Sequence, residues 1–152
     1  MMRLTFPPLL TEEELHTVAH TIAEVEAKTS GEIRVSIRRR RGWRERKLSI
    51  AGLALREFHH LGMNKTKDKT GVLLFICVAD RAFHIVGDEG IHKKVPDTFW
   101  ESLADTMGGH FKDGKFCHGI CSMIKEIGAV LEKEFPSHGK NPDELPNDVV
   151  VS

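Results

Sequence analysis

Two apolar runs separated by one polar pair constrain the fold of this chain more than any other feature. The first run covers residues 72–79 without interruption, Asp80-Arg81 follows, and the second run covers residues 82–86. A continuous apolar run rich in β-branched residues is typical of a strand that is covered on both faces. Because strands joined by a short turn pair antiparallel, the two runs are predicted to form a hairpin.

Size and charge limit the class of protein. A chain of 152 residues, of which 40% are hydrophobic, is sufficient for one domain with a single core. The 22 Lys and Arg residues balance the 22 Asp and Glu residues, so no net charge directs the chain to nucleic acid. No apolar run is long enough to span a bilayer, and residues 1–10 lack the pattern of a signal peptide. We therefore expect a soluble, cytoplasmic protein.

The remaining elements follow from periodicity and capping. A helix is predicted to begin at Thr11, with Glu14 completing a capping box. Residues 32–38 alternate between polar and apolar, which predicts a strand with one polar face at a sheet edge. Further helices are predicted over residues 45–61, from Pro96-Asp97 to Gly108-Gly109, and over residues 115–134, where Pro136 ends the last one.

These elements predict an α/β fold. The strand at 32–38, the helix at 45–61 and the strand from Gly71 form a βαβ unit, whose two strands are expected to be parallel. With the hairpin they make a small mixed sheet with helices packed on it. We predict a single domain over residues 1–136. Residues 137–152 are polar and rich in proline, which predicts a disordered C-terminal tail.

Three cysteines and one run of arginines each allow two interpretations. Cys77 lies in the first apolar run and is predicted to be a core residue. Cys117 and Cys121, with His118 between them, could form half of a zinc site, but core packing is favoured because no second ligand pair has metal spacing. The segment from Arg38 to Arg46 is either an anion or RNA patch or a solvated loop. We favour the loop because no basic face with interleaved aromatic residues accompanies it.

The hairpin separates the carboxylates into two groups. Asp80 lies at the turn, whereas Asp88 and Glu89 follow the returning strand in a glycine-flanked loop, roughly 20 Å away. Because the first two strands are predicted to be parallel, Glu32 begins at the same end of the sheet as Asp88. The loop carrying Asp68 and the helix start at Asp97 are expected there too.

We call these five residues the acidic edge: Glu32, Asp68, Asp88, Glu89 and Asp97. Clustered carboxylate oxygens suit calcium or magnesium, so the acidic edge is the predicted metal site. The alternatives are that Asp97 serves only as a helix cap and that the loop carboxylates only form a turn. A second candidate site is Asp80 with Arg81, where Asp80 is expected to meet Arg38 or Arg39.

Five motifs, in order, resemble the TPM-domain family, and the resemblance covers about residues 11–135. They are Thr-Ser-Gly-Glu-Ile at 29–33, Thr-Gly-Val-Leu-Leu at 70–74, Asp80-Arg81, Gly-Asp-Glu-Gly-Ile at 87–91, and Phe-Lys-Asp-Gly-Lys-Phe at 111–116 followed by Gly119. Lys-Val-Pro at 94–96 and Phe99-Trp100 are similar to the bacterial branch. The resemblance implies a three-layer α/β/α sandwich, divalent cation binding in some members and a proposed acid phosphatase activity. Asp80, Asp88 and Glu89 occupy the matching positions.

Three functions follow from these features. The first is a binding or accessory module that takes up calcium or magnesium through its acidic loop and contacts another protein. The second is a metal-assisted phosphatase, which needs a cationic clamp for phosphate beside the metal. The acidic edge lacks an obvious arginine, and Lys93 and Lys94 are the nearest candidates for such a clamp, so we favour the module. The third and weakest is binding of an anion or RNA by the segment Arg38–Arg46.

Overall fold

The computed structural model describes residues 8–137 and 146–152 of the chain. Its helices are α1 (Glu12–Glu26), α2 (Ile50–His60), α3 (Glu89–His92), α4 (Asp97–Lys112) and α5 (Phe116–Glu134), with 3₁₀ turns η1 (Trp43–Glu45) and η2 (Met63–Lys65). Its strands are β1 (Glu32–Arg38), β2 (Gly71–Cys77), β3 (Ala82–Gly87) and β4 (Val150–Val151). None of these helices is long and apolar enough to cross a membrane.

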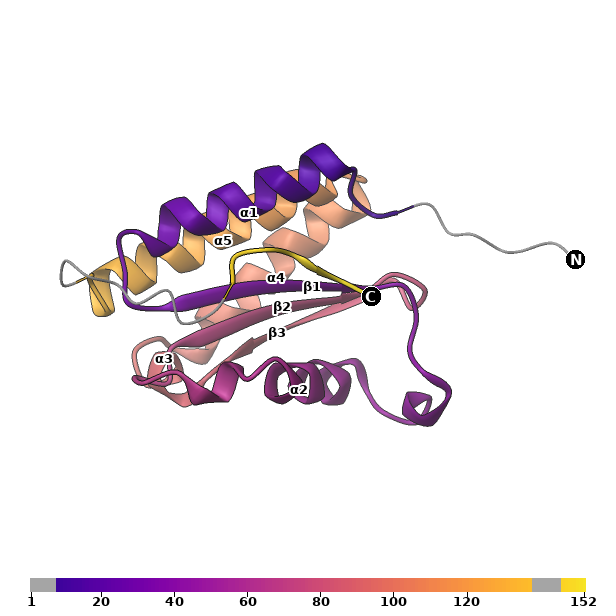
Figure 1. The fold of residues 1–152 in the computed structure, drawn as a ribbon, viewed down its shortest axis with the longest axis horizontal. Helices are drawn as coiled ribbons and strands as arrows, with labels where there is room; N and C mark the ends of the chain where they lie inside the picture. The colour runs from indigo at the N-terminus through magenta and orange to yellow at the C-terminus, as the bar shows by residue number, and fades with distance from the viewer. Residues whose placement is uncertain (1–7, 138–145) are drawn as a thin grey trace, which may run out of the picture.

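The sheet has the strand order β3-β2-β1-β4. Strands β1 and β2 are parallel, from Glu32 opposite Gly71 to Arg38 opposite Cys77, and β3 returns antiparallel to β2. The predicted βαβ pairing and hairpin are therefore confirmed. Figure 1 shows α1, α4 and α5 on one face of the sheet and α2 on the other, so the fold is the expected three-layer α/β/α sandwich.

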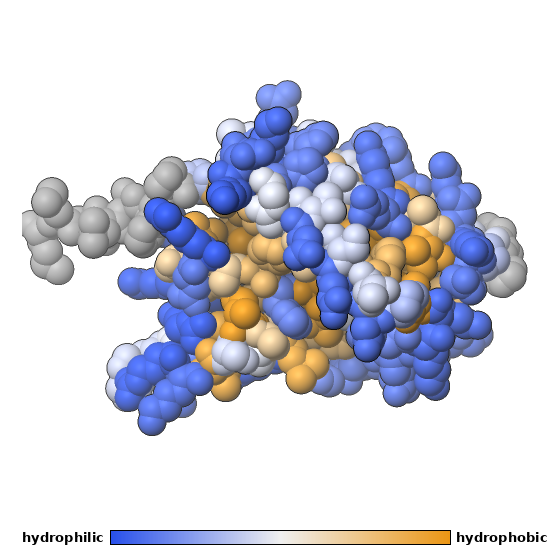
Figure 2. All heavy atoms as spheres, turned by 180° about the vertical axis from the view of Figure 1, so that it is seen from behind, coloured by the Kyte–Doolittle hydropathy of each residue, from blue (hydrophilic) through white to orange (hydrophobic). Residues whose placement is uncertain are grey.

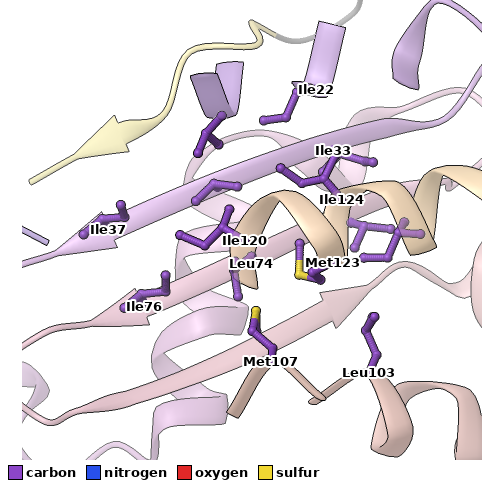
Figure 3. Close-up of a cluster of buried hydrophobic side chains, with 14 of the residues drawn as sticks. Ile22, Ile33, Ile37, Leu74, Ile76, Leu103, Met107, Ile120, Met123 and Ile124 are labelled. Carbon is purple, nitrogen blue, oxygen red and sulfur yellow. The ribbon is translucent and has the colours of Figure 1, made fainter. Parts of the chain in front are cut away.

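Strand β2 contributes side chains to two cores, which explains why its apolar run has no polar interruption. The larger core lies between the sheet and the three-helix layer, and the smaller one lies under α2. Alternate β2 residues enter them: Val72, Leu74 and Ile76 the larger, and Leu73, Phe75 and Cys77 the smaller. Figure 3 shows Leu74 beside the α5 side chain Ile120, and Ile76 belongs to the same cluster. The core position predicted for Cys77 is confirmed.

The prediction that β1 lies at a sheet edge is wrong. Strand β4 pairs with it in parallel, Val150 opposite Ser36 and Val151 opposite Ile37, so β1 is internal. Its polar face is buried under α2, where the Ser36 hydroxyl donates a hydrogen bond of 2.6 Å to the Glu57 carboxylate. Ser36, on the polar face of β1, therefore binds a buried residue of α2 instead of solvent.

The structure also changes three predicted boundaries. The prediction of a disordered tail over 137–152 is wrong for Val150–Val151, because these apolar residues complete the sheet; residues 138–145 lie outside the described part of the chain. Helix α2 starts at Ile50, where the Ser49 side chain caps it, instead of at residue 45. Helix α4 continues through Gly108-Gly109 to Lys112, since the packing of Met107 and Phe111 against the sheet outweighs the poor helix propensity of glycine.

Candidate functional site

The backbone brings Glu32, Asp68 and Asp88 to one end of the sheet. Glu32 is the first residue of β1 and lies opposite Gly71. The Asp88 amide donates to the carbonyl of the same Gly71, at 2.9 Å. The Gly90 amide donates to the Lys69 carbonyl at 2.9 Å, which holds the loop containing Asp68 against α3.

Gly90 is placed so tightly that only glycine fits. A Cβ atom there would lie 2.2 Å from the Asp68 carbonyl oxygen and 2.5 Å from that of Lys69, and both are backbone atoms. Lys69 itself has a φ of 56°, in the left-handed region. The close contact between α3 and this loop is therefore fixed by backbone geometry.

Asp88 has a carboxylate oxygen that is available to a ligand. It caps α3, and its Oδ1 accepts a hydrogen bond of 2.8 Å from the Glu89 amide. Its Oδ2 is buried and has no hydrogen-bond partner among the residues described. A buried carboxylate oxygen without a partner is costly, so an additional group that binds it would stabilise the protein.

The other acidic residues do not complete a metal cage with Asp88. Glu89 and Asp97 are exposed, and Glu32 is buried at the start of β1. Over residues 8–137 and 146–152, no three Asp, Glu, His or Cys side chains lie close enough to hold one ion together. The acidic edge is thus a shared end of the sheet, not a preformed centre.

The alternative interpretation of Asp97, that it serves only as a helix cap, is wrong. Pro96 occupies the N-cap position of α4, without a side-chain hydrogen bond, and Asp97 is the first helical residue. A carboxylate in the first turn still stabilises the helix through its dipole.

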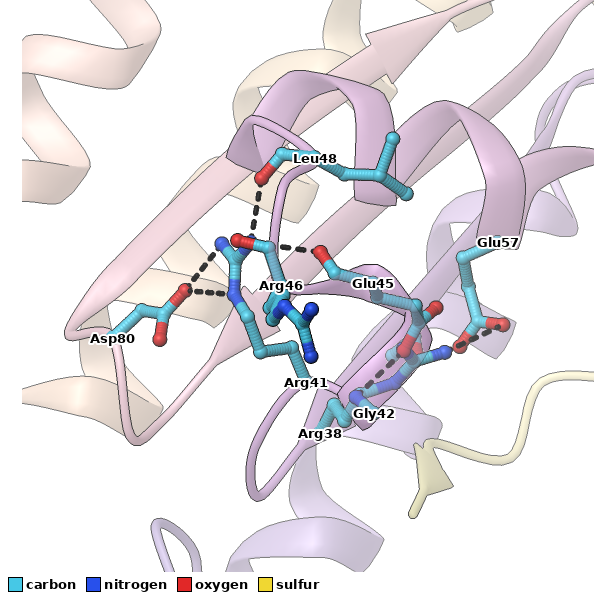
Figure 4. Close-up of polar contacts among 9 residues, drawn as sticks. Arg38, Arg41, Gly42, Glu45, Arg46, Leu48, Glu57 and Asp80 are labelled. Atoms are coloured by element: carbon cyan, nitrogen blue, oxygen red, sulfur yellow. Dashed lines mark hydrogen bonds and ion pairs between the residues drawn. The ribbon is translucent and has the colours of Figure 1, made fainter.

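The opposite end of the sheet holds the turn between β2 and β3, where Asp80 pairs with an arginine. The partner is Arg41, whose Nε and Nη2 bind Asp80 Oδ2 at 2.9 and 2.6 Å, as Figure 4 shows. The expected pairing with Arg38 or Arg39 is therefore wrong. Asp80 and Asp88 do lie at opposite ends of β3, as the hairpin predicted.

Several arginines of the segment 38–46 are bound by neighbouring residues. Arg38 binds Glu45 at 2.7 and 2.9 Å and lies 3.8 Å from Glu57, while Arg41 Nη1 also donates to the Glu45 carbonyl at 3.0 Å. The Gly42 amide, and then the Arg38 guanidinium, hold the pKa of Glu45 below its usual value. The Arg46 guanidinium stacks over the Trp43 ring at 4.2 Å. These contacts favour the loop interpretation of this segment.

Arg81, the second residue of the turn, lines a cavity that the sequence did not indicate. It has a φ of 50°, and it makes no ion pair with the residues described. The cavity has a volume of about 850 Å³ and lies between the turn and the end of α4. Its walls come from segments far apart in the chain, so no local motif could reveal it.

Cys117 and Cys121 form a packed pair of thiols. The Thr21 hydroxyl lies 3.6 Å from the Cys121 sulfur as a hydrogen-bond donor, and both cysteines pack against the larger core. Burial, and then the neighbouring Cys121, raise the pKa of Cys117 to about 11. No metal cluster includes them in the described part of the chain, which favours the core interpretation over half of a zinc site.

The raised pKa leads to a prediction about reactivity. Because the thiolate is the reactive form, Cys117 at pH 8 should react with iodoacetamide roughly one hundred times more slowly than the same residue in unfolded protein. Mass spectrometry of the labelled peptides measures both rates. Equal rates in folded and urea-unfolded protein would show that Cys117 is not protected in this way.

Comparisons with known proteins give consistent matches. The model of the TPM domain matches residues 6–130. The solution structure of the BA42 protein from the psychrophilic bacterium Bizionia argentinensis is 34% identical, covers 97% of this chain and 99% of its own, and superimposes with a TM-score of 0.86. A search of curated proteins gave no match.

Two more distant structures are similar in fold alone. The N-terminal domain of a protein from P. gingivalis is 19% identical over 86% of this chain and 82% of its own, with a TM-score of 0.68. The N-terminal domain of the cg2496 protein from Corynebacterium glutamicum is 9% identical over 80% of this chain and 74% of its own, with a TM-score of 0.60.

Proposed function

This chain belongs to the TPM-domain family, and from that premise we propose that it is a binding module whose acidic edge takes up a calcium or magnesium ion. The observation that carries the proposal is the buried Oδ2 of Asp88, which lacks a partner among the residues described. Hard cations prefer such oxygens, and a bound ion would compensate for burying the carboxylate.

The lack of a dense carboxylate cage is compatible with this proposal. Magnesium in particular keeps several water ligands and needs only one or two carboxylates from the protein. Asp88 supplies the first ligand, and the backbone carbonyls of the adjacent loop are further oxygen donors. Glu32, Asp68, Glu89 and Asp97 add negative charge around the ion at longer range.

A cation bound at Asp88 would affect the structure of the surface around it. Asp88 caps α3, and α3 is tied to the loop before β2 by the hydrogen bond from Gly90 to Lys69. An ion that draws these segments together would order the exposed residues of α3 and change their charge. We propose that this ordered surface contacts another protein.

The phosphatase alternative is less well supported. It needs cations that hold a phosphoryl group beside the metal. Arg38 and Arg41 are paired with acids at the opposite end of the sheet, and the cations nearest to Asp88 in sequence are the exposed Lys93 and Lys94. RNA binding by the arginine segment is weaker still, because Arg38 and Arg41 are already paired with Glu45 and Asp80. The proposal includes a cytoplasmic location, which the three free cysteines support.

Calorimetric titration with calcium and with magnesium tests the proposal. Asp88→Asn keeps an oxygen that can cap α3 but removes the charge, so it should weaken cation affinity at least about tenfold with little loss of stability. Asp113→Asn, at the far end of α4, is the matched control and should bind like the wild type.

Equal affinity in the Asp88 and Asp113 variants would refute the assignment of the ion to Asp88. Turnover of a chromogenic phosphate that Asp88→Asn abolishes and Asp113→Asn retains would instead favour the phosphatase.

A further inference from the structure

The cavity beside the β2–β3 turn is separate from the acidic edge, and nothing in the proposed function uses it. We call it the hairpin cavity. Its volume of about 850 Å³ lies within the range of small-molecule sites, and β2, β3, α4 and the start of α5 contribute residues to it. Figure 1 shows α3 at one end of the sheet and the turn at the other. A ligand in the hairpin cavity would thus bind far from Asp88.

Three phenylalanines form a connected wall of the hairpin cavity. The rings of Phe83 and Phe111 are 5.3 Å apart in an edge-to-face arrangement, and those of Phe111 and Phe116 are 5.2 Å apart. The three residues come from β3, α4 and α5, and each is only partly buried. Figure 2 shows apolar atoms exposed among hydrophilic ones on this side of the molecule. Aromatic walls that remain accessible favour a ligand with an apolar body.

The charged residues that line the hairpin cavity are both cations. They are Arg81, at the turn, and Lys112, the last residue of α4. Both are exposed, and neither forms an ion pair with any residue that the structure describes. The acid next to Arg81 is not available, because Asp80 is bound by Arg41. An anionic group at the mouth of the cavity would therefore find two cations that are not neutralised.

The backbone holds Arg81 in place. Its amide donates to the Val78 carbonyl at 3.0 Å, and its φ of 50° lies in the left-handed region, which a residue with a side chain rarely adopts. The turn therefore presents an arginine where a glycine would be the relaxed choice.

We propose that the hairpin cavity binds a small amphipathic carboxylate of the fatty-acid class. Its hydrocarbon chain lies against Phe83, Phe111 and Phe116, and its carboxylate pairs with Arg81 and Lys112. Apolar burial supplies the affinity, and the two cations select the charged head group over a neutral one. The site goes beyond the proposed cation binding and does not depend on it.

Titration of the full chain with decanoate, below its micellar concentration and in the presence of EDTA, tests this proposal. Calorimetry gives the affinity, and amide chemical shifts locate the site. We expect the largest shifts at residues 76–83 and 108–116. Decanol, which has the same chain without the charge, and acetate, which has the charge without the chain, should both bind at least about tenfold more weakly.

Two matched variants distinguish specific ion pairs between decanoate and the cavity cations from non-specific attraction of decanoate to other cations on the surface. The double variant Arg81→Gln/Lys112→Gln should weaken decanoate binding at least about tenfold and leave decanol binding unchanged, because only the ion pairs are lost. Lys125→Gln, an exposed cation on α5 that does not line the cavity, should bind decanoate like the wild type. All of these residues are exposed, so the variants should keep the unfolding temperature of the wild type.

The proposal is overturned if decanoate does not bind, or if the largest amide shifts lie outside the hairpin cavity. It is equally overturned if decanol binds as tightly as decanoate, or if the double variant keeps the wild-type affinity. Because EDTA removes divalent cations, a negative result here leaves the assignment of a cation to Asp88 unaffected.

Discussion

Replacing Gly90 by alanine is expected to lower the free energy of unfolding by about 3 kcal/mol, because the new methyl group meets fixed backbone atoms. The Asp68 carbonyl oxygen would lie 2.2 Å from the added carbon. To relieve that overlap, α3 must move away from the loop before β2. That movement breaks the hydrogen bond from Gly90 to Lys69 and strains the one from Asp88 to Gly71.

Gly109→Ala is the matched control for this prediction. Gly109 lies inside α4, and no atom beyond its neighbours in the helix would come within 4 Å of its added Cβ. Alanine is the better helix former, so this variant should gain about 0.5 to 1 kcal/mol. Urea denaturation of both variants measures the difference. A Gly90 variant as stable as the wild type would mean that α3 does not lie against the loop as described.

Leu74→Ala is expected to have a comparably large effect, a loss of about 2 to 5 kcal/mol, since it leaves a cavity in the larger core. Leu74 is in the middle of β2 and is 0% exposed. Figure 3 shows it beside Ile120 of α5, so both the sheet and the helix layer lose contacts.

The same substitution on the opposite face of the molecule controls for the loss of leucine itself. Leu55 lies on α2 and is 50% exposed, so Leu55→Ala should cost less than about 1 kcal/mol. Thermal or urea unfolding of the two variants gives the comparison. If both substitutions cost the same, β2 is not the buried centre of the domain.

The β2–β3 hairpin was predictable, because the residues that determine it are adjacent in the sequence. The uninterrupted apolar run of β2 is required by its two cores, and the short turn at Asp80-Arg81 sets the direction of β3. The position of β1 was not predictable, because its neighbour β4 comes from the other end of the chain and pairs through two residues only. A two-residue strand has no periodicity that a sequence pattern could reveal.

The sequence predicted which backbone segments meet at each end of the sheet, but not how their side chains are oriented. Strand directions correctly placed Glu32, Asp68 and Asp88 together. They could not show that the carboxylates fail to share one centre, because that depends on side-chain orientation. Likewise, Arg38 is directed over the Phe75 ring at 5.5 Å and toward Glu57, which leaves Asp80 to Arg41.

The most direct test of the account is a map of amide chemical shifts as the full chain is titrated with calcium and then with magnesium. If Asp88 anchors the ion, the largest shifts are expected at residues 87–92 and in the adjoining loop at 68–71, with little change at the turn around Asp80. Shifts centred on residues 38–48 and 80–81, or no saturable shifts at all, would contradict cation uptake at the acidic edge.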